Sequence, residues 1–253
     1  MLTILNLNVN DFGGISHHIM EYRKLNNQGK EVIDWVSWKN VDKKAPFLSI
    51  LNYIEKTYPS IVILQEFEVN NSKEPKMLIE QLSKYGYKMI SNIPSYKASI
   101  TVVFAKSKCM PMNNPNTLNY RSYTFKVGDI IIYGTHVPPT GKDRIKVFWD
   151  EIDNFYNRYR EEKMLLIGDF NTINKENMER YKQLLNAGCI DVWIKKGYSD
   201  DIPTCGKNRM DIAMVSSKLL PFVSNITICP SLLYKGMTDH AAVILNIDMI
   251  SKS

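Results

Sequence analysis

Residues 164–171 read Met-Leu-Leu-Ile-Gly-Asp-Phe-Asn, and this stretch decides the fold expected for the chain. Four apolar residues in a row, followed at once by a glycine, are too few for a buried helix and are typical of a strand covered on both faces. Asp169 follows where that strand should end, and Asn171 would project to the same side in an extended chain. An acid and an amide at a strand end suit a cation and a phosphate oxygen, with a plain Asx turn as the alternative.

A second stretch, residues 61–67, has the same form. It reads Ile-Val-Ile-Leu-Gln-Glu-Phe, so that Glu66 also follows four apolar residues at the end of a predicted strand. Two carboxylates that lie close together repel each other unless a proton or a cation lies between them. Glu66 and Asp169 are therefore predicted to share one anionic site, and a divalent metal ion is the simplest way to neutralise it.

Composition limits the class of protein. The 253 residues contain no stretch that resembles a linker, and we expect residues 1–253 to form a single domain. Hydrophobic residues at 44% and charged residues at 23% are ordinary for a soluble globular enzyme. The formal charge of +6 favours polyanionic partners, of which nucleic acid and anionic lipid headgroups are the two obvious classes.

The sequence also predicts where the protein works. No apolar run approaches the roughly 18 residues of a membrane helix. Residues 1–6 lack the basic start and apolar core of a signal peptide. We therefore expect a cytoplasmic protein, and nothing in the sequence indicates an obligate protein partner. The four cysteines are far apart without a C-x-x-C pair, so we expect reduced packing residues rather than a zinc knuckle or disulfides.

The remaining elements follow from apolar periodicity. Residues 2–10 alternate apolar side chains with Asn6, Asn8 and Asn10. Residues 11–45 fit least well: Ser16 is predicted to cap a short helix through Leu25, and adjacent His17 and His18 are interpreted as surface or capping residues. Further strands are predicted at 100–105, 122–127, 130–137, 209–216, 222–229 and 241–245, and helices at 46–58, 74–84, 141–159 and 178–185.

Two histidines lie at predicted strand boundaries. His136 precedes Pro138 and Pro139, which end the strand, although a single histidine in such a place is structural more often than catalytic. His240 follows Asp239 just before the last strand. An acid beside a histidine could supply a base, and a second acid such as Asp211 could orient the imidazole.

Six motifs in order carry a resemblance to a known family. The chain resembles the endonuclease/exonuclease/phosphatase superfamily, which includes deoxyribonuclease I and exonuclease III. The resemblance implies an α/β four-layer sandwich, with two mixed β-sheets packed face to face and flanked by helices. It also implies hydrolysis of a phosphate ester with Mg²⁺, for which Mn²⁺ is an alternative. The motifs are Asn8-Val9-Asn10, Leu64-Gln65-Glu66, Thr135-His136, Gly168-Asp169-Phe170-Asn171, Arg209-Met210-Asp211 and Thr238-Asp239-His240.

The resemblance also implies a role for each motif residue. Glu66 matches the principal metal ligand, with Asn8 and Asp239 beside it. Asp169 and Asn171 match the pair that positions the nucleophile and grips the phosphate. His240, oriented by Asp211, matches the histidine at the phosphate, and His136 matches the second histidine of the deoxyribonuclease I-like and phosphatase branches. Exonuclease III-type enzymes usually have a tyrosine there, which makes that branch less favoured.

The substrate stays open at this stage. Basic loops suggest a nuclease acting on DNA or RNA, with Arg144, Lys207, Arg209 and Asn10 as candidate phosphate or substrate contacts. For Arg144 and its basic neighbours, the alternative to a substrate contact is an ordinary helix start exposed to solvent. A phosphatase or phosphodiesterase acting on a lipid headgroup or small metabolite is the second hypothesis, and a binding protein without catalysis is the third. The interval between Asn8 and Glu66 is long for the family, so residues 11–45 are a candidate specificity insert.

Overall fold

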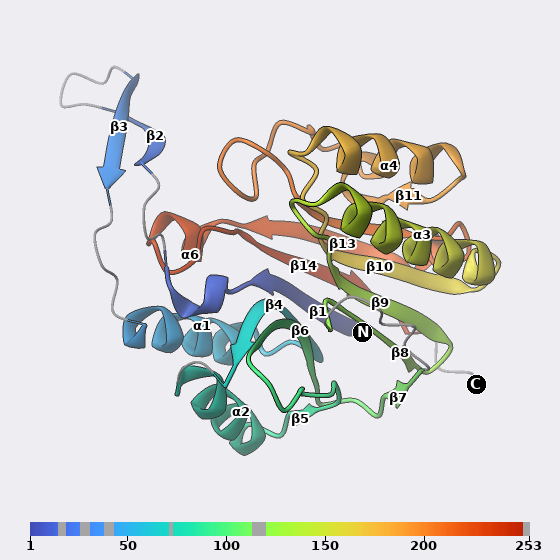
Figure 1. Cartoon of the computed structure of the whole chain (residues 1–253), viewed down its shortest axis with the longest axis horizontal. Coiled ribbons are helices and arrows are strands. Elements are labelled where there is room, and N and C mark those ends of the chain that lie inside the picture. The colour runs from blue at the N-terminus through green and yellow to red at the C-terminus, as the bar shows by residue number, and fades with distance from the viewer. Residues whose placement is uncertain (15–18, 26–30, 38–42, 71–72, 113–119, 250–253) are drawn as a thin grey trace.

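The computed structural model describes residues 1–14, 19–25, 31–37, 43–70, 73–112 and 120–249. Two mixed six-stranded sheets lie face to face in this part of the chain, with helices on their outer faces (Figure 1). The α/β four-layer sandwich predicted from the sequence is confirmed.

The first sheet contains both ends of the chain. Its order is β13-β14-β1-β4-β6-β5. Strands β1 and β4 run parallel, and the other neighbours are antiparallel. The bounds are β1 Leu2–Asn8, β4 Ile61–Val69, β5 Lys88–Met89, β6 Ala98–Ala105, β13 Val223–Cys229 and β14 Ala242–Ile247.

The second sheet is built around another parallel pair, β9 and β10. Its order is β11-β12-β10-β9-β8-β7, and its other neighbours are antiparallel. The bounds are β7 Met110–Pro111, β8 Ser122–Val127, β9 Ile130–His136, β10 Lys163–Asp169, β11 Ile190–Asp191 and β12 Asp211–Val215.

Three apolar clusters separate the four layers. The cluster between the sheets includes Ile63 of β4 and Ile132 of β9. A second cluster packs α1 (Lys44–Thr57) and α2 (Glu74–Lys84) on the first sheet. A third packs α3 (Lys142–Tyr159) and α4 (Lys175–Asn186) on the second sheet. The continuous apolar runs of β4 and β10 are explained by this arrangement, because each strand is covered on both faces.

The prediction of a short helix from Ser16 through Leu25 is wrong. Residues Ile19–Leu25 form strand β2, which pairs antiparallel with β3 (Glu31–Ser37) in a separate two-stranded sheet. A short polar segment has weak local preference, and the pairing strand that selects the extended conformation comes several residues later. The expectation for His17 and His18 lies outside the described residues.

Short helical segments complete the fold. They are η1 (Asn10–Phe12), α5 (Val192–Lys195), η2 (Leu220–Phe222) and α6 (Ser231–Tyr234). Among the helices that the structure describes, none combines the length and the apolar character needed to cross a membrane.

Candidate active site

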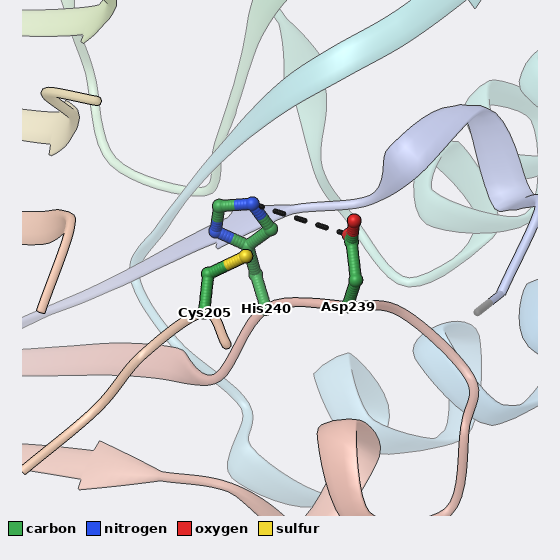
Figure 2. Close-up of side chains that lie close together, drawn as sticks. All are labelled: Cys205, Asp239 and His240. Atoms are coloured by element: carbon green, nitrogen blue, oxygen red, sulfur yellow. Dashed lines mark ion pairs between the residues drawn. The ribbon is translucent and has the colours of Figure 1, made fainter. Parts of the chain in front are cut away.

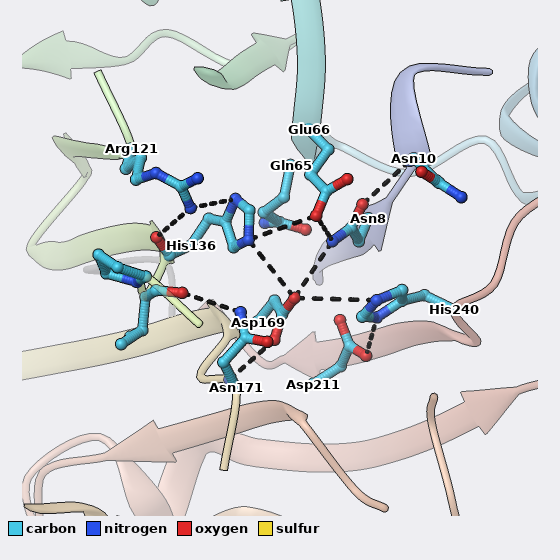
Figure 3. Close-up of polar contacts among 12 residues, drawn as sticks. Asn8, Asn10, Gln65, Glu66, Arg121, His136, Asp169, Asn171, Asp211 and His240 are labelled. Atoms are coloured by element: carbon cyan, nitrogen blue, oxygen red, sulfur yellow. Dashed lines mark hydrogen bonds and ion pairs between the residues drawn. The ribbon is translucent and has the colours of Figure 1, made fainter. Parts of the chain in front are cut away.

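Strand register brings the predicted acids and histidines to one end of the two sheets. In the second sheet, Asp169 at the end of β10 lies opposite His136 of β9 on one side and Asp211 of β12 on the other. In the first sheet, Asn8 at the end of β1 lies opposite Gln65 of β4. These strand ends face one another across the gap between the sheets (Figure 3).

A bulge in β4 turns Glu66 toward this site. The pairing of β4 with β6 shifts register between Leu64 and Phe67, and Glu66 adopts a left-handed φ of 49°. Gln65 points into the buried interior, where its Nε2 donates a 2.7 Å hydrogen bond to Asn6 Oδ1. A bulge re-aims a side chain that a regular strand would bury, and its strained backbone is typical of functional positions.

The turn after β10 fixes Asp169 and Asn171. The backbone N–H of Asn171 donates to Asp169 Oδ1 at 2.9 Å, so the Asx turn considered above is present. The side-chain amide of Asn171 donates to the carbonyl of Val137 at 2.8 Å. The other Asp169 oxygen, Oδ2, faces the site, while the amide oxygen of Asn171 stays available as an acceptor.

Glu66, His136 and Asp169 form the centre of the site. Each offers one possible ligand atom, and the three atoms lie within 4.8 Å of one another. The side-chain amide of Asn8 bridges the two carboxylates, donating to Glu66 Oε1 at 3.2 Å and to Asp169 Oδ2 at 3.1 Å. The two acids that the sequence predicted to share one site therefore do so.

Burial makes these carboxylates costly to ionise without a cation. Desolvation raises the pKa of Asp169 to about 7, with nearby Asp211 and Glu66 adding to the rise and His240 opposing it. Burial also raises the pKa of Glu66, and the charge of Asp239 adds to that rise. A divalent ion would offset the repulsion among these oxygens.

His240 is the charged histidine of the site. Its Nδ1 lies 2.8 Å from Asp211 Oδ2, and its Nε2 lies 3.8 Å from Asp169 Oδ2. Burial disfavours the imidazolium, but the Asp211 carboxylate outweighs this effect, and the pKa of His240 is raised well above its ordinary value. The structure thus places Asp211 against the ring of His240, and its role in orienting the imidazole for the reaction stays a prediction.

His136 has the opposite electrostatic environment. Burial lowers its pKa well below the ordinary value, and the charges of Arg121 and His240 add to this effect. Arg121 Nη1 lies 2.9 Å from His136 Nδ1, and a guanidinium can only donate. The neutral ring consequently carries its proton on Nε2, which lies 3.5 Å from Glu66 Oε1.

Arg121 was missed by the sequence analysis. It comes directly before β8 and belongs to none of the six motifs. Its one visible signal was a basic residue at a strand start, which is too common to be informative. Burial lowers the pKa of Arg121, and the charge of Arg144, which lies in the first turn of α3, adds to the effect.

Asn10 and Lys207 were also expected to contact phosphate or substrate. Asn10 uses its side-chain amide to donate a 2.7 Å hydrogen bond to the carbonyl of Gly14, and its backbone N–H donates to Asn8 Oδ1 at 3.0 Å. Lys207 is exposed in the loop that precedes β12.

The expectation that Arg209 contacts substrate is wrong. Only 3% of its side chain is exposed, and its guanidinium donates to Asp191 Oδ2 at 2.8 Å and to Asp200 Oδ1 at 2.7 Å. Arg209 and Asp191 are both buried, so removing one of them would leave the charge of the other unpaired away from water. The sequence shows the arginine beside Asp211 but not the acids that take up its donors.

The four cysteines are free, as expected, but one of them is more than a packing residue. Cys205 lies beside His240 and Asp239, and the possible ligand atoms of these three residues are within 4.8 Å of one another (Figure 2). Burial raises the pKa of the Cys205 thiol, while the neighbouring His240 works against the rise.

The oxygen donors of Glu66, Asp239 and Asn8 are of the kind that a hard divalent ion prefers. Glu66 and Asp239 offer carboxylate oxygens, and Asp239 Oδ1 accepts no hydrogen bond from any residue that the structure describes. Asn8 presents its NH₂ group to the carboxylates, and its Oδ1 accepts from Asn10 with one lone pair left over. Oxygen ligands in small number suit Mg²⁺, which keeps several waters. That Asn8, Glu66 and Asp239 are the ligands stays a prediction.

No protein-family model matches the sequence, and no curated protein matches it. Solved structures do match. An AP endonuclease from Archaeoglobus fulgidus aligns with a TM-score of 0.71 and 14% identity, over 98% of this chain and 100% of that chain. With the same coverage, the 3′ phosphatase NExo from Neisseria bound to product DNA hairpin aligns at 0.69 and 14%, and an endonuclease/exonuclease/phosphatase family protein from Leptotrichia buccalis at 0.64 and 17%. At such identities the similarity establishes the fold alone, and this fold is the one that the resemblance implied.

Proposed function

From this fold and this geometry, we propose that the protein is a Mg²⁺-dependent hydrolase of phosphate esters, and specifically a nuclease that cleaves phosphodiester bonds in DNA or RNA. The observation that carries the proposal is the convergence of Glu66, Asp169 and the His240–Asp211 pair on one point at the ends of the two sheets. These residues come from four separate segments of the chain, between Glu66 and His240, so their meeting is a property of the fold.

Glu66 and Asp239, with the remaining lone pair of Asn8 Oδ1, would hold the metal ion. The ion would neutralise charge on a non-bridging phosphate oxygen. The buried carboxylates already have raised pKa values without a cation, which supports a site built for one.

The protein's own groups would then orient and stabilise the reacting phosphate. Asp169 Oδ2 faces the site and is a candidate acceptor for the proton of the attacking water. The imidazolium of His240 and the Nε2–H of neutral His136 are donors on either side of Asp169, at 3.8 and 3.7 Å. Donors held in place before the reaction stabilise developing negative charge without reorganisation.

The surroundings favour a polyanionic substrate. Arg121, directly before β8, and Arg144, in the first turn of α3, lie close enough for their charges to interact. The chain as a whole carries a formal charge of +6. Among the structural neighbours, one is an AP endonuclease and another is a 3′ phosphatase bound to product DNA hairpin. Nucleic acid is therefore favoured over a small ester as the substrate.

The experiment is a substrate panel with matched variants. Supercoiled plasmid, single-stranded DNA, RNA, a phosphorylated lipid headgroup and small phosphate esters are incubated with the protein in Mg²⁺, in Mn²⁺ or in EDTA. Glu66→Gln and Asp169→Asn should each lower the rate by about a hundredfold or more, because each removes a charged group that faces the reacting phosphate. Glu68→Gln is the control, since Glu68 lies on the same strand and pairs with Lys97 at 3.8 Å.

The outcomes separate the alternatives. Cleavage of nucleic acid that EDTA stops, and that weakens steeply with salt, supports the proposal. Hydrolysis confined to the lipid headgroup or small esters, with little salt dependence, would identify a phosphatase or phosphodiesterase. Full activity of Glu66→Gln would contradict the site itself.

A further inference from the structure

We propose that Cys205, Asp239 and His240 form a second metal site, selective for a thiophilic ion such as Zn²⁺, and that its occupation inhibits the hydrolysis proposed above. The three residues offer sulfur, oxygen and nitrogen atoms that lie within 4.8 Å of one another (Figure 2). The inhibition rests on the proposed function, whereas the binding of the ion does not.

Backbone pairing holds the two segments that carry these ligands. Cys205 and His240 form an antiparallel bridge, and Ala241 N–H donates to the Thr204 carbonyl at 2.7 Å. Cys205 also exchanges two 3.0 Å backbone hydrogen bonds with Asn208, which closes its loop into a tight turn. The sulfur and the imidazole are therefore placed side by side before any ion binds.

The imidazole is oriented for coordination. Nδ1 of His240 is engaged by Asp211 at 2.8 Å, which leaves Nε2 as the atom that can bind a metal. A histidine that ligates a metal commonly uses its other ring nitrogen in this way, because the carboxylate fixes the ring and makes it a better donor to the ion. This Nε2 lies 3.9 Å from Asp239 Oδ1.

An unpartnered carboxylate oxygen gives a second, independent observation. Asp239 Oδ1 is shielded from solvent and accepts no hydrogen bond within the part of the chain that the structure describes. Two ligands about 2.0–2.1 Å from a tetrahedral zinc ion lie about 3.3 Å apart. The observed 3.9 Å between Asp239 Oδ1 and His240 Nε2 therefore needs a movement of only about half an ångström.

The ligand types select the ion. A thiolate and an imidazole suit Zn²⁺, whereas Mg²⁺ prefers oxygen ligands and several waters. Three protein ligands leave a fourth position for water, as in many zinc sites. On binding, the thiol proton of Cys205 and the Nε2 proton of His240 pass to solvent, and both atoms then donate an electron pair to the ion.

This ion would remove two groups from the proposed reaction. His240 would lose the Nε2–H that faces the phosphate, and Asp239 would be drawn from the Mg²⁺ that it is predicted to share with Glu66. The two metal sites thus overlap at Asp239, and the bound Zn²⁺ would oppose the Mg²⁺-supported reaction.

The first test measures binding without substrate. The full-length protein is treated with EDTA, dialysed and titrated with Co²⁺, whose thiolate complexes absorb by sulfur-to-metal charge transfer. Wild type and the control Cys109→Ser should show this absorption at one ion per chain, and Cys205→Ser should lack it. Isothermal titration with Zn²⁺ should show at least a tenfold loss of affinity in Cys205→Ser. If wild type lacks the absorption, or Cys205→Ser keeps it, the site does not exist.

The second test measures inhibition. Zn²⁺ is titrated into the Mg²⁺-supported reaction, and each variant is normalised to its own rate without zinc. Cys205→Ser should need at least tenfold more Zn²⁺ for half inhibition than wild type or Cys109→Ser, and Cys205→Ala repeats the measurement should the serine variant fold poorly. Equal inhibition of all variants would refute the inhibitory role. Absence of hydrolysis in every protein would refute the proposed function alone, because the cobalt absorption is read without substrate.

Discussion

Replacing Asp211 by Asn keeps the shape of the side chain and removes the charge that faces the imidazole of His240. The two groups lie 2.8 Å apart, with 0% of the Asp211 side chain and 6% of the His240 side chain exposed. At that distance their attraction is about 6 kcal/mol at an effective dielectric constant of about 20. The desolvation of both charges offsets part of it, and breaking a buried pair by removing one partner costs about 3–5 kcal/mol. We therefore expect Asp211→Asn to lose about 3–5 kcal/mol of unfolding free energy, or about 6–20 °C in melting temperature.

The pH dependence of this loss has a definite sign. The pKa of His240 is raised in the folded protein, so its contribution to stability is fully present below the ordinary imidazole pKa of about 6.5 and is lost as the pH rises through the folded pKa. The difference in unfolding free energy between wild type and Asp211→Asn should thus be largest at about pH 6 and should become smaller in alkaline buffer. Histidine resonances should show the pKa of His240 falling in the variant.

The measurement is urea unfolding in EDTA at several pH values, together with an NMR titration. Asp239→Asn is the matched control, because Asp239 also faces His240 but at 3.9 Å and with 25% of its side chain exposed. A pair of that kind contributes about 1 kcal/mol or less. If Asp211→Asn and Asp239→Asn unfold with equal free energies at every pH, or if His240 titrates alike in both, the assignment of Asp211 as its partner is refuted.

Three further predictions concern the supports of the site. Gly168→Ala should destabilise the fold by about 1–3 kcal/mol or more in thermal unfolding, since an added Cβ would collide with the Thr135 carbonyl; an unchanged melting temperature would contradict the close approach of β10 and β9. Arg209→Met should lose about 3–5 kcal/mol of unfolding free energy, because it leaves the buried Asp191 carboxylate without its partner, and the KM of the folded fraction should be unaffected. A stable variant with a raised KM would show that Arg209 contacts the substrate after all. Arg121→Met should lower kcat about tenfold or more and let His136 populate both neutral tautomers in ¹⁵N spectra, with partial rescue by Arg121→Lys; an unchanged tautomer would show that Arg121 does not position this ring.

The site works as an arrangement of opposed charges. Two histidines flank Asp169, and their pKa values differ in opposite directions from the ordinary value. Burial lowers the pKa of His136, with Arg121 adding to the effect, whereas Asp211 outweighs burial and raises the pKa of His240. One ring is therefore a neutral donor and the other an imidazolium at neutral pH. Pairs of titratable groups with separated pKa values are a common feature of acid–base sites.

The sequence by itself determined the layers and the acidic centre. The apolar runs before Glu66 and Asp169 predict strands covered on both faces, because only a sheet packed on both sides tolerates so many consecutive apolar residues. Periodicity also predicted α2 at its observed bounds, Glu74–Lys84, and α3 within one residue. The carboxylates at the ends of both predicted strands pointed to a shared site, because two nearby acids need a proton or a cation between them.

Only the tertiary structure decided where the long charged side chains point. Arg209 turns inward to Asp191, and Arg121 turns to His136, although both are equally plausible surface cations in the sequence. The bulge that re-aims Glu66 depends on its pairing with β6, and the position of Cys205 beside His240 depends on a bridge between segments 35 residues apart. Local sequence fixes backbone preference and burial, but the partner of a flexible charged or sulfur-bearing side chain comes from distant segments, so it is set only when the chain packs.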